Sequence, residues 1–80
     1  MAKLIKFEEL QEGFEYWEEW SAGTACLRCK VLRIRPRGTI EMRYWGDGPR
    51  TWTQATLRDP HYRYWDSEPS LDEREEARWS

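Results

Sequence analysis

The chain has 80 residues, of which 15% are aromatic and 35% are charged, and its formal net charge is −2. This length fits a single domain, and the six Trp and four Tyr supply the large apolar areas that a short chain needs for a core. No run of about 20 apolar residues is present, which excludes a membrane-spanning helix. The N-terminus lacks the apolar core of a signal peptide, so we expect a cytoplasmic protein with reduced thiols.

The charges are unevenly distributed along the chain. Residues 1–20 carry two Lys and six Glu, residues 21–65 carry nine basic and three acidic groups, and residues 66–80 carry two Arg and six acidic groups. A basic central segment is therefore flanked by acidic ends. Either the ends pack beside the centre and neutralise it, or the centre offers a basic face to an acidic partner.

The first elements expected in chain order are a short edge strand over 3–7, a helical turn over 8–12, a bend at Gly13 and a strand over 14–20. A glycine inside a helix costs roughly 1 kcal/mol. We therefore prefer this interpretation to one amphipathic helix over 7–20. That alternative would give an α+β fold, with an N-terminal helix packed on a meander of three or four antiparallel strands.

The strongest pattern is a β-meander over residues 25–53. Its first turn, Pro-Arg-Gly at 36–38, is typical of a three-residue hairpin loop, because proline presets one φ and glycine accepts a positive one. The resulting register places Leu32 opposite Met42, and it turns aliphatic side chains to one face and arginines to the other. Before this turn, the apolar residues shift from odd-numbered to even-numbered positions, which predicts a β-bulge near 31–32.

A second turn is expected over 46–49, a helical turn over 54–60 and a closing strand over 61–66. In order and spacing, residues 7–66 resemble the SH3-like and Tudor-like small β-barrels. The resemblance implies a barrel whose loops and open side bind peptides or nucleic acids. We therefore predict a mainly β fold, an SH3-like antiparallel barrel of about five strands with a short C-terminal helix.

The expected barrel domain covers residues 1–66, and an acidic tail covers residues 67–80. Ser70, with Glu73 three positions further on, fits a capping box, which predicts a short helix over 71–79. The apolar stripe of this helix is thin, and a short helix alone in water is marginal. It either docks on the body of the protein or frays until a partner binds.

No catalytic motif and no complete metal site occur in the sequence. Cys26 and Cys29 form a Cys-x-x-Cys pair, but with His61 they supply only three of the four ligands of a structural zinc site. Strand positions three apart also point to opposite faces, so we expect structural cysteines, with Cys29 buried and Cys26 partly exposed. The six glutamates within 8–19 are expected to form a solvated face, and no cofactor or metal is predicted.

The most informative set of residues is the outward side of the first hairpin and its neighbouring loops. Arginine side chains bind phosphates and carboxylates, and an exposed Trp can stack on a base or a partner's side chain. The predicted partner-binding residues are Arg33, Arg35, Arg37, Arg43, Trp45, Trp20 and Arg50. In the alternative interpretation, Arg33 and Glu41 form a cross-strand ion pair, and the arginines only keep an edge strand soluble.

A second candidate site is an aromatic cage that holds a methylated ammonium by cation–π attraction, as in Tudor-like barrels. The rings considered for it are Trp17, Trp20, Trp45, Trp52 and Tyr16. Sequence alone does not place these rings around one pocket, and core packing explains Trp52 better.

These observations predict a non-enzymatic interaction module that binds a protein partner through Trp and Arg residues, which concentrate binding energy at interfaces. We expect a small regulator or inhibitor of the kind that bacteriophages and mobile elements encode, with no membrane contact. The first alternative is nucleic-acid binding through the same basic face, although the acidic ends would repel a polyanion. The second alternative is a small enzyme assembled by oligomerisation, for which the sequence shows no nucleophile, base or cofactor loop.

Overall fold

The computed structural model describes residues 1–21 and 26–77. Its strands are β1 (Leu4–Ile5), β2 (Glu15–Trp20), β3 (Cys26–Ile34), β4 (Thr39–Tyr44), β5 (Gly48–Thr53) and β6 (Tyr62–Trp65). Its helical elements are the 3-10 turn η1 (Phe7–Glu9) and the α-helices α1 (Gln54–Leu57) and α2 (Leu71–Glu76). None of the described helices has the length and apolar composition needed to cross a bilayer.

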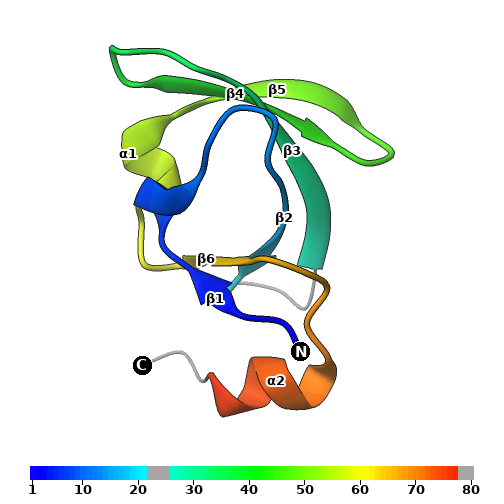
Figure 1. Ribbon diagram of the computed structural model, residues 1–80. Coiled ribbons are helices and arrows are strands. Elements are labelled where there is room, and N and C mark those ends of the chain that lie inside the picture. The colour runs from blue at the N-terminus through cyan, green and yellow to red at the C-terminus, as the bar shows by residue number, and fades with distance from the viewer. Residues whose placement is uncertain (22–25, 78–80) are drawn as a thin grey trace.

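The strands form one antiparallel sheet in the order β1-β6-β2-β3-β4-β5, which curls around a single core (Figure 1). The predicted mainly β, antiparallel fold with a short C-terminal helix is confirmed. The sheet has six strands instead of about five, and within the described ranges no ladder joins its edge strands β1 and β5. It is therefore an open, curled sheet, because β1 adds to the free side of β6 and does not reach β5.

The core lies on the inner face of the curl. β4 contributes Ile40, Met42 and Tyr44 to it, and β3 contributes Cys29 and Val31, all of them buried. Side chains of successive strand residues point to opposite faces. The residues between these core positions therefore project from the outer face of the sheet.

The β3–β4 hairpin contains the predicted bulge. Arg33 pairs with Glu41 as expected, but the register then shifts, and Val31 pairs with Met42. Leu32 is the extra residue between these pairs, so the predicted pairing of Leu32 with Met42 is wrong. The bulge shifts by one residue which side chains of β3 point inward, so Val31 and Met42 face the core together and are fully buried.

Gly38 adopts a left-handed φ of 69° in the turn of this hairpin. A Cβ added there would meet no atom within 4 Å, so a substitution is opposed by backbone strain alone. We expect Gly38→Ala to lower the free energy of unfolding by about 1–2 kcal/mol in a urea titration. Gly38→Asn should lose clearly less, because asparagine tolerates this conformation. Equal losses in the two variants would contradict the strain explanation.

The N-terminal segment follows the preferred interpretation. The helical turn is η1, and Gly13 makes the expected bend with a φ of 87°. The alternative of one helix over 7–20 is wrong, because β2 is paired along its length with β3 on one side and β6 on the other. The first residue of the predicted meander, Ala25, lies outside the described residues.

The tail helix α2 begins with the predicted capping box. The Ser70 hydroxyl accepts a hydrogen bond from the Glu73 amide, and the Glu73 carboxylate accepts one from the Ser70 amide, each at 3.0 Å. The Glu73 carboxylate also accepts a hydrogen bond of 2.8 Å from the Ala2 amide, which ties the helix to the N-terminus. Leu71 is 73% exposed, so this residue does not dock the helix. Trp79, the end of the predicted helix, lies outside the described residues.

Helix α2 covers only half of the outer face of the sheet (Figure 1). Trp65 of β6 projects outward, since its neighbour Tyr64 belongs to the core, yet Trp65 is buried. Leu4 and Trp65 line a hollow together with Glu73 and Ala77, which places α2 over β1 and β6. The outward residues of β3, β4 and β5 form the other half, which has no covering element among the described residues. We call this part the open half.

Candidate binding surfaces

Trp45, directly after β4, is 48% exposed on the open half. Its amide donates a hydrogen bond of 3.1 Å to the Arg28 carbonyl, and the Arg28 guanidinium carbon lies 4.4 Å from the centre of the indole ring. The same guanidinium forms an ion pair of 3.3 Å with Glu15 on β2. The cation–π contact thus orders an indole that solvent still reaches.

Further cations project from the same face along the β3–β4 hairpin. The register places Lys30 opposite Arg43 and Arg33 opposite Glu41, all four on the outer face. Arg33 and Glu41 form no ion pair within the described part of the chain, so the pair proposed in the alternative interpretation is not formed. The described hairpin cations that lack an ion pair are Lys30, Arg33, Arg35, Arg37 and Arg43.

Apart from the Glu15–Arg28 pair, the ion pairs of the acidic ends lie away from the hairpin. Glu8 pairs with Arg58 at 3.8 Å, and Glu19 pairs with both Arg63 and Arg74 at 2.8 Å. The neutralisation expected from the acidic ends is therefore observed for part of the basic segment only. The acidic segments satisfy cations near β6, α1 and α2, while the hairpin retains its positive charge.

Two of the predicted partner-binding residues do not share this surface. Arg50 pairs in the β4–β5 ladder with Met42, whose side chain lies in the core, so Arg50 belongs to the inner face. Trp20 and Arg50 line a cavity of ≈ 120 Å³ with Trp52. The strand periodicity therefore separates Trp20 and Arg50 from the outward arginines and Trp45.

The rings considered for an aromatic cage are distributed over three environments. Trp20 and Trp52 line the cavity beside Arg50, whereas Trp17, like Trp45, lies on the outer face, since it pairs with Arg28. Tyr16 is buried in the core. One cage built from all of these rings is therefore not formed.

Sequence reasoning missed two buried carboxyl groups. Glu18 is 1% exposed and Glu19 is 3% exposed, so the prediction of a solvated acidic face is wrong for both. Because side chains alternate along β2, Glu18 points to the inner face and Glu19 to the outer face, where α2 covers it. Their consecutive positions in the sequence could have indicated this, since neighbouring residues of a central strand point to opposite faces and cannot share one solvated face.

The Glu18 carboxyl lies within a cluster of uncharged groups. The Tyr44 hydroxyl donates to its two oxygens at 3.2 and 3.1 Å, and the Trp20 indole N–H donates to one of them. Burial raises the pKa of Glu18, and the hydrogen bonds from Trp20 and Tyr44 lower it only in part. Glu18 therefore orients the tyrosine and the tryptophan that form two walls of the ≈ 120 Å³ cavity.

Glu19 connects α2 to the sheet. Its carboxylate accepts hydrogen bonds from Arg63 at 2.8 and 3.1 Å, from Arg74 at 2.8 Å and from the Trp65 indole at 3.0 Å. Burial raises the pKa of Glu19, but these hydrogen bonds and the charge of Arg63 outweigh that effect, and the pKa lies below its ordinary value. The ionised form is therefore the one that the fold stabilises.

The cysteine pair has no arrangement suited to chelation. Cys26 pairs with Glu19 on the outer face, and Cys29 pairs with Tyr16 on the inner face. Cys29 is buried and Cys26 is half-buried, as predicted. Burial raises the pKa of Cys26 to about 11 and also raises that of Cys29, which keeps both thiols protonated near neutral pH. Within the described ranges, no three metal-ligating side chains lie together.

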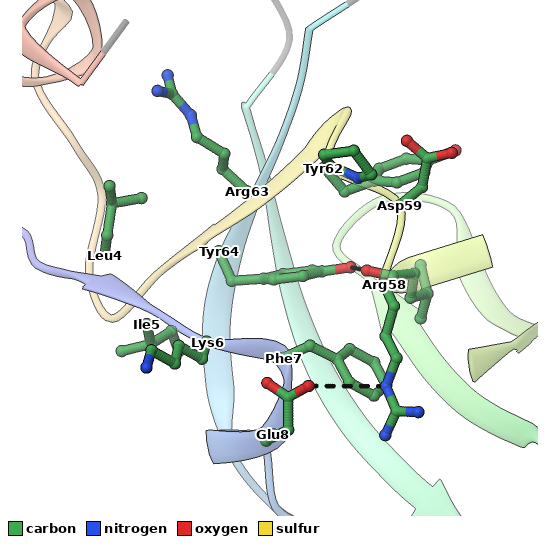
Figure 2. A pocket seen from close by; sticks show the side chains of 12 residues that line it. Leu4, Ile5, Lys6, Phe7, Glu8, Arg58, Asp59, Tyr62, Arg63 and Tyr64 are labelled. Carbon is green, nitrogen blue, oxygen red and sulfur yellow. Dashed lines mark hydrogen bonds and ion pairs between the residues drawn. The ribbon is translucent and has the colours of Figure 1, made fainter. Parts of the chain in front are cut away.

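A groove of ≈ 350 Å³ lies between the β1–η1 segment and the α1–β6 segment (Figure 2). The Arg58 guanidinium carbon lies 4.9 Å from the centre of the Phe7 ring, and the same side chain pairs with Glu8. The Tyr64 hydroxyl donates a hydrogen bond to the Leu57 carbonyl. These polar groups are satisfied within the protein, so the groove is a seam between two packed segments.

Comparisons of the chain with protein-family models, curated proteins and solved structures find no match in any of the three. The described residues offer two candidate binding places of different chemistry. One is the cationic open half around Trp45, and the other is the small aromatic cavity beside Trp52.

Proposed function

We propose that this protein is an interaction module that binds an acidic segment of a protein partner through the open half. The observation that supports this most is an exposed indole, Trp45, held by Arg28 at the end of a hairpin whose Lys30 and Arg43 share its face and have no ion pair among the described residues. Indole and guanidinium side chains concentrate binding energy at interfaces. Cations without internal partners also attract carboxylates over a distance and accelerate their encounter.

A protein partner suits the open half better than a nucleic acid does. Glu41 stands opposite Arg33, and Glu15 lies beside Arg28, so carboxylates are interspersed among the cations. This mixture opposes a continuous row of phosphates but admits the separate carboxylates of an acidic protein segment, whose other residues are uncharged. Nucleic-acid binding is the second candidate, because a base can stack on the exposed Trp45.

The strand order β6-β2-β3-β4-β5, with the helical turn α1 before β6, supports the resemblance to SH3-like and Tudor-like folds as part of this proposal. The resemblance implies binding through loops and an open side of the sheet, and fold alone does not define the ligand. We propose a non-enzymatic regulator or inhibitor in the cytoplasm, of the kind that phages and mobile elements encode.

Capture of the partner from a lysate of the source organism should depend on Trp45. Truncating an interface hot spot costs about 2 kcal/mol or more, so Trp45→Ala should weaken binding about 30-fold. Arg33→Glu combined with Arg43→Glu should abolish capture, because it turns attraction of carboxylates into repulsion. Quantitative pull-down, followed by calorimetry with the captured protein, measures both effects.

The matched control is Lys3→Glu combined with Lys6→Glu, which reverses the same number of exposed cations away from the hairpin. Capture by this control variant should equal that by the wild type. Treatment of the lysate with nuclease separates the two candidates, since loss of capture after nuclease would establish a nucleic-acid ligand. Equal capture by wild type and Trp45→Ala would contradict the proposal.

A further inference from the structure

Strand β5 is one of the two edges of the sheet (Figure 1) and has six residues, whereas the other edge strand, β1, has two. The Gln54 amide donates a hydrogen bond of 2.7 Å to the Gly38 carbonyl, which continues the β4–β5 ladder by one pair. Hydrogen-bonded pairs alternate with non-hydrogen-bonded pairs in an antiparallel ladder, so every second residue of β5 directs its backbone groups away from β4. The residues with backbone groups at this free edge are Pro49, Thr51 and Thr53.

These three residues do not all offer a complete set of backbone groups. Proline has no N–H, so Pro49 offers its carbonyl alone. Thr53 is the N-cap of α1, so its carbonyl accepts the first hydrogen bond of that helix and its N–H alone remains. Thr51, between them, offers both its N–H and its carbonyl. Within the described part of the chain, no hydrogen bond satisfies these four groups.

An arbitrary antiparallel strand cannot pair fully with this edge. Its residue opposite Pro49 would direct both an N–H and a carbonyl at β5, and the carbonyl would find no donor. A backbone group that is covered without a partner is unfavourable, which is how prolines at sheet edges oppose non-specific pairing. The strand that fits must have a carbonyl already in use at that position.

A second copy of β5 has this property. We consider two copies that pair antiparallel, with Thr51 of one opposite Thr51 of the other. Each Thr51 then donates to and accepts from its counterpart, and each Thr53 N–H donates to the Pro49 carbonyl of the other copy. The missing N–H of Pro49 faces the Thr53 carbonyl of the other copy, which α1 already uses. Four backbone hydrogen bonds form, and no backbone group of these three residues is left without a partner.

The same register suits the side chains of the inner face. It places Arg50 of each copy opposite Trp52 of the other, in the non-hydrogen-bonded pairs where side chains lie closest. The Arg50 side chain is 52% exposed, and Trp52 is only partly buried, so the guanidinium and the indole can meet in a cation–π contact. No two like charges stand directly opposite each other in this register.

We propose that the protein forms a two-fold symmetric homodimer in which β5 pairs with β5 of a second copy about Thr51. The two sheets become one continuous sheet. This inference goes beyond the proposed function and does not depend on it. Thr51 pairs with Glu41 and projects from the outer face, so the open halves of the two copies adjoin and stay accessible to a partner.

The test is analytical ultracentrifugation of the full chain over a range of concentrations. Four hydrogen bonds of ordinary net strength correspond to a dissociation constant of about 1 mM, so we expect dimers at about 0.1–1 mM protein. Thr51→Pro removes the central N–H from both copies without removing a bond to β4, and it should weaken dimerisation about 30-fold.

The matched control is Leu4→Pro at the other edge of the sheet. The Asp66 amide donates to the Lys3 carbonyl, so the N–H of Leu4, the next residue, points away from β6. This variant also loses an outward N–H from an edge strand, yet it should dimerise as the wild type does. A wild type that stays monomeric at about 1 mM would overturn the inference. Equal dimerisation by Thr51→Pro and wild type would also overturn it.

A second measurement identifies the register without any substitution. In a mixture of isotope-labelled and unlabelled wild type, filtered nuclear Overhauser spectra report only contacts between copies. Non-hydrogen-bonded pairs bring Cα atoms to about 4.5 Å, so the Hα atoms of Arg50 and Trp52 should show a contact between copies. A dimer without this contact would contradict pairing about Thr51. Neither measurement involves Arg33, Arg43 or Trp45, so a failure here is distinguishable from a failure of the open half to bind.

Discussion

Glu19→Ala should destabilise the protein more than the loss of any exposed ion pair. The substitution leaves the largely buried guanidinium groups of Arg63 and Arg74 without the carboxylate between them. Removing one partner from a buried ion pair typically costs about 3–5 kcal/mol. Small domains are stable by only about 5–15 kcal/mol, so urea titration should show an unfolding free energy reduced by a large fraction.

The matched control is Glu15→Ala on the same strand. Glu15 pairs with Arg28, but both side chains are about half exposed, and such pairs contribute roughly 0–1 kcal/mol. Glu19→Ala should also weaken the attachment of α2, which proteolysis of the tail would report. A loss no larger than that of Glu15→Ala would contradict the role of Glu19 as the link between α2 and the sheet.

Glu18→Gln should become progressively more stable, relative to the wild type, as the pH rises. The pKa of Glu18 is raised by burial in the folded protein, so the folded form holds its proton where the unfolded form has lost it. Wild-type stability must therefore fall as the pH rises from about 4.5, the ordinary value, through the folded pKa. Glutamine does not titrate, and the relative gain should be about 1.4 kcal/mol per unit of pKa shift.

Urea titrations of both proteins near pH 4.5 and at about pH 8 measure this difference. Glu19→Gln serves as the control of opposite sign. The pKa of Glu19 is lowered in the folded state, so its ionised form stabilises the fold above the unfolded pKa and loses that effect as the pH falls. Glu19→Gln should therefore lose stability relative to the wild type as the pH rises. If the difference in unfolding free energy between Glu18→Gln and the wild type did not change with pH, the raised pKa of Glu18 in the folded state would be contradicted.

Local chemistry made much of the fold predictable. Pro36 and Gly38 determine the hairpin turn, Gly13 determines the bend before β2, and Ser70 with Glu73 caps the tail helix. Each of these features depends on residues close in sequence, whose φ preferences and hydrogen bonds act whatever the rest of the chain does. Sequence patterns therefore identified the positions of the strands along the chain and the outward direction of Arg33 and Arg43.

The remaining features depend on contacts between distant segments. The alternating pattern over 3–7 predicted an edge strand correctly, but the pairing of β1 with β6, which keeps the sheet open, is set by distant contacts that no local pattern encodes. Glu19 is buried because α2 folds back across β2, more than 40 residues later in the chain. Trp20 and Arg50 face away from Trp45 because of their pairing with neighbouring strands. The sequence pattern did not predict these pairings.

The location of the partner can be measured most directly by photo-crosslinking in the source organism. A benzophenone amino acid in place of Thr51 would stand on the open half, where Thr51 pairs with Glu41. The same group in place of Leu71 would stand on the exposed side of α2. We expect position 51 alone to yield an adduct, joined to a partner peptide rich in Asp and Glu. Adducts from position 71 alone, or equally from both positions, would contradict partner binding by the open half.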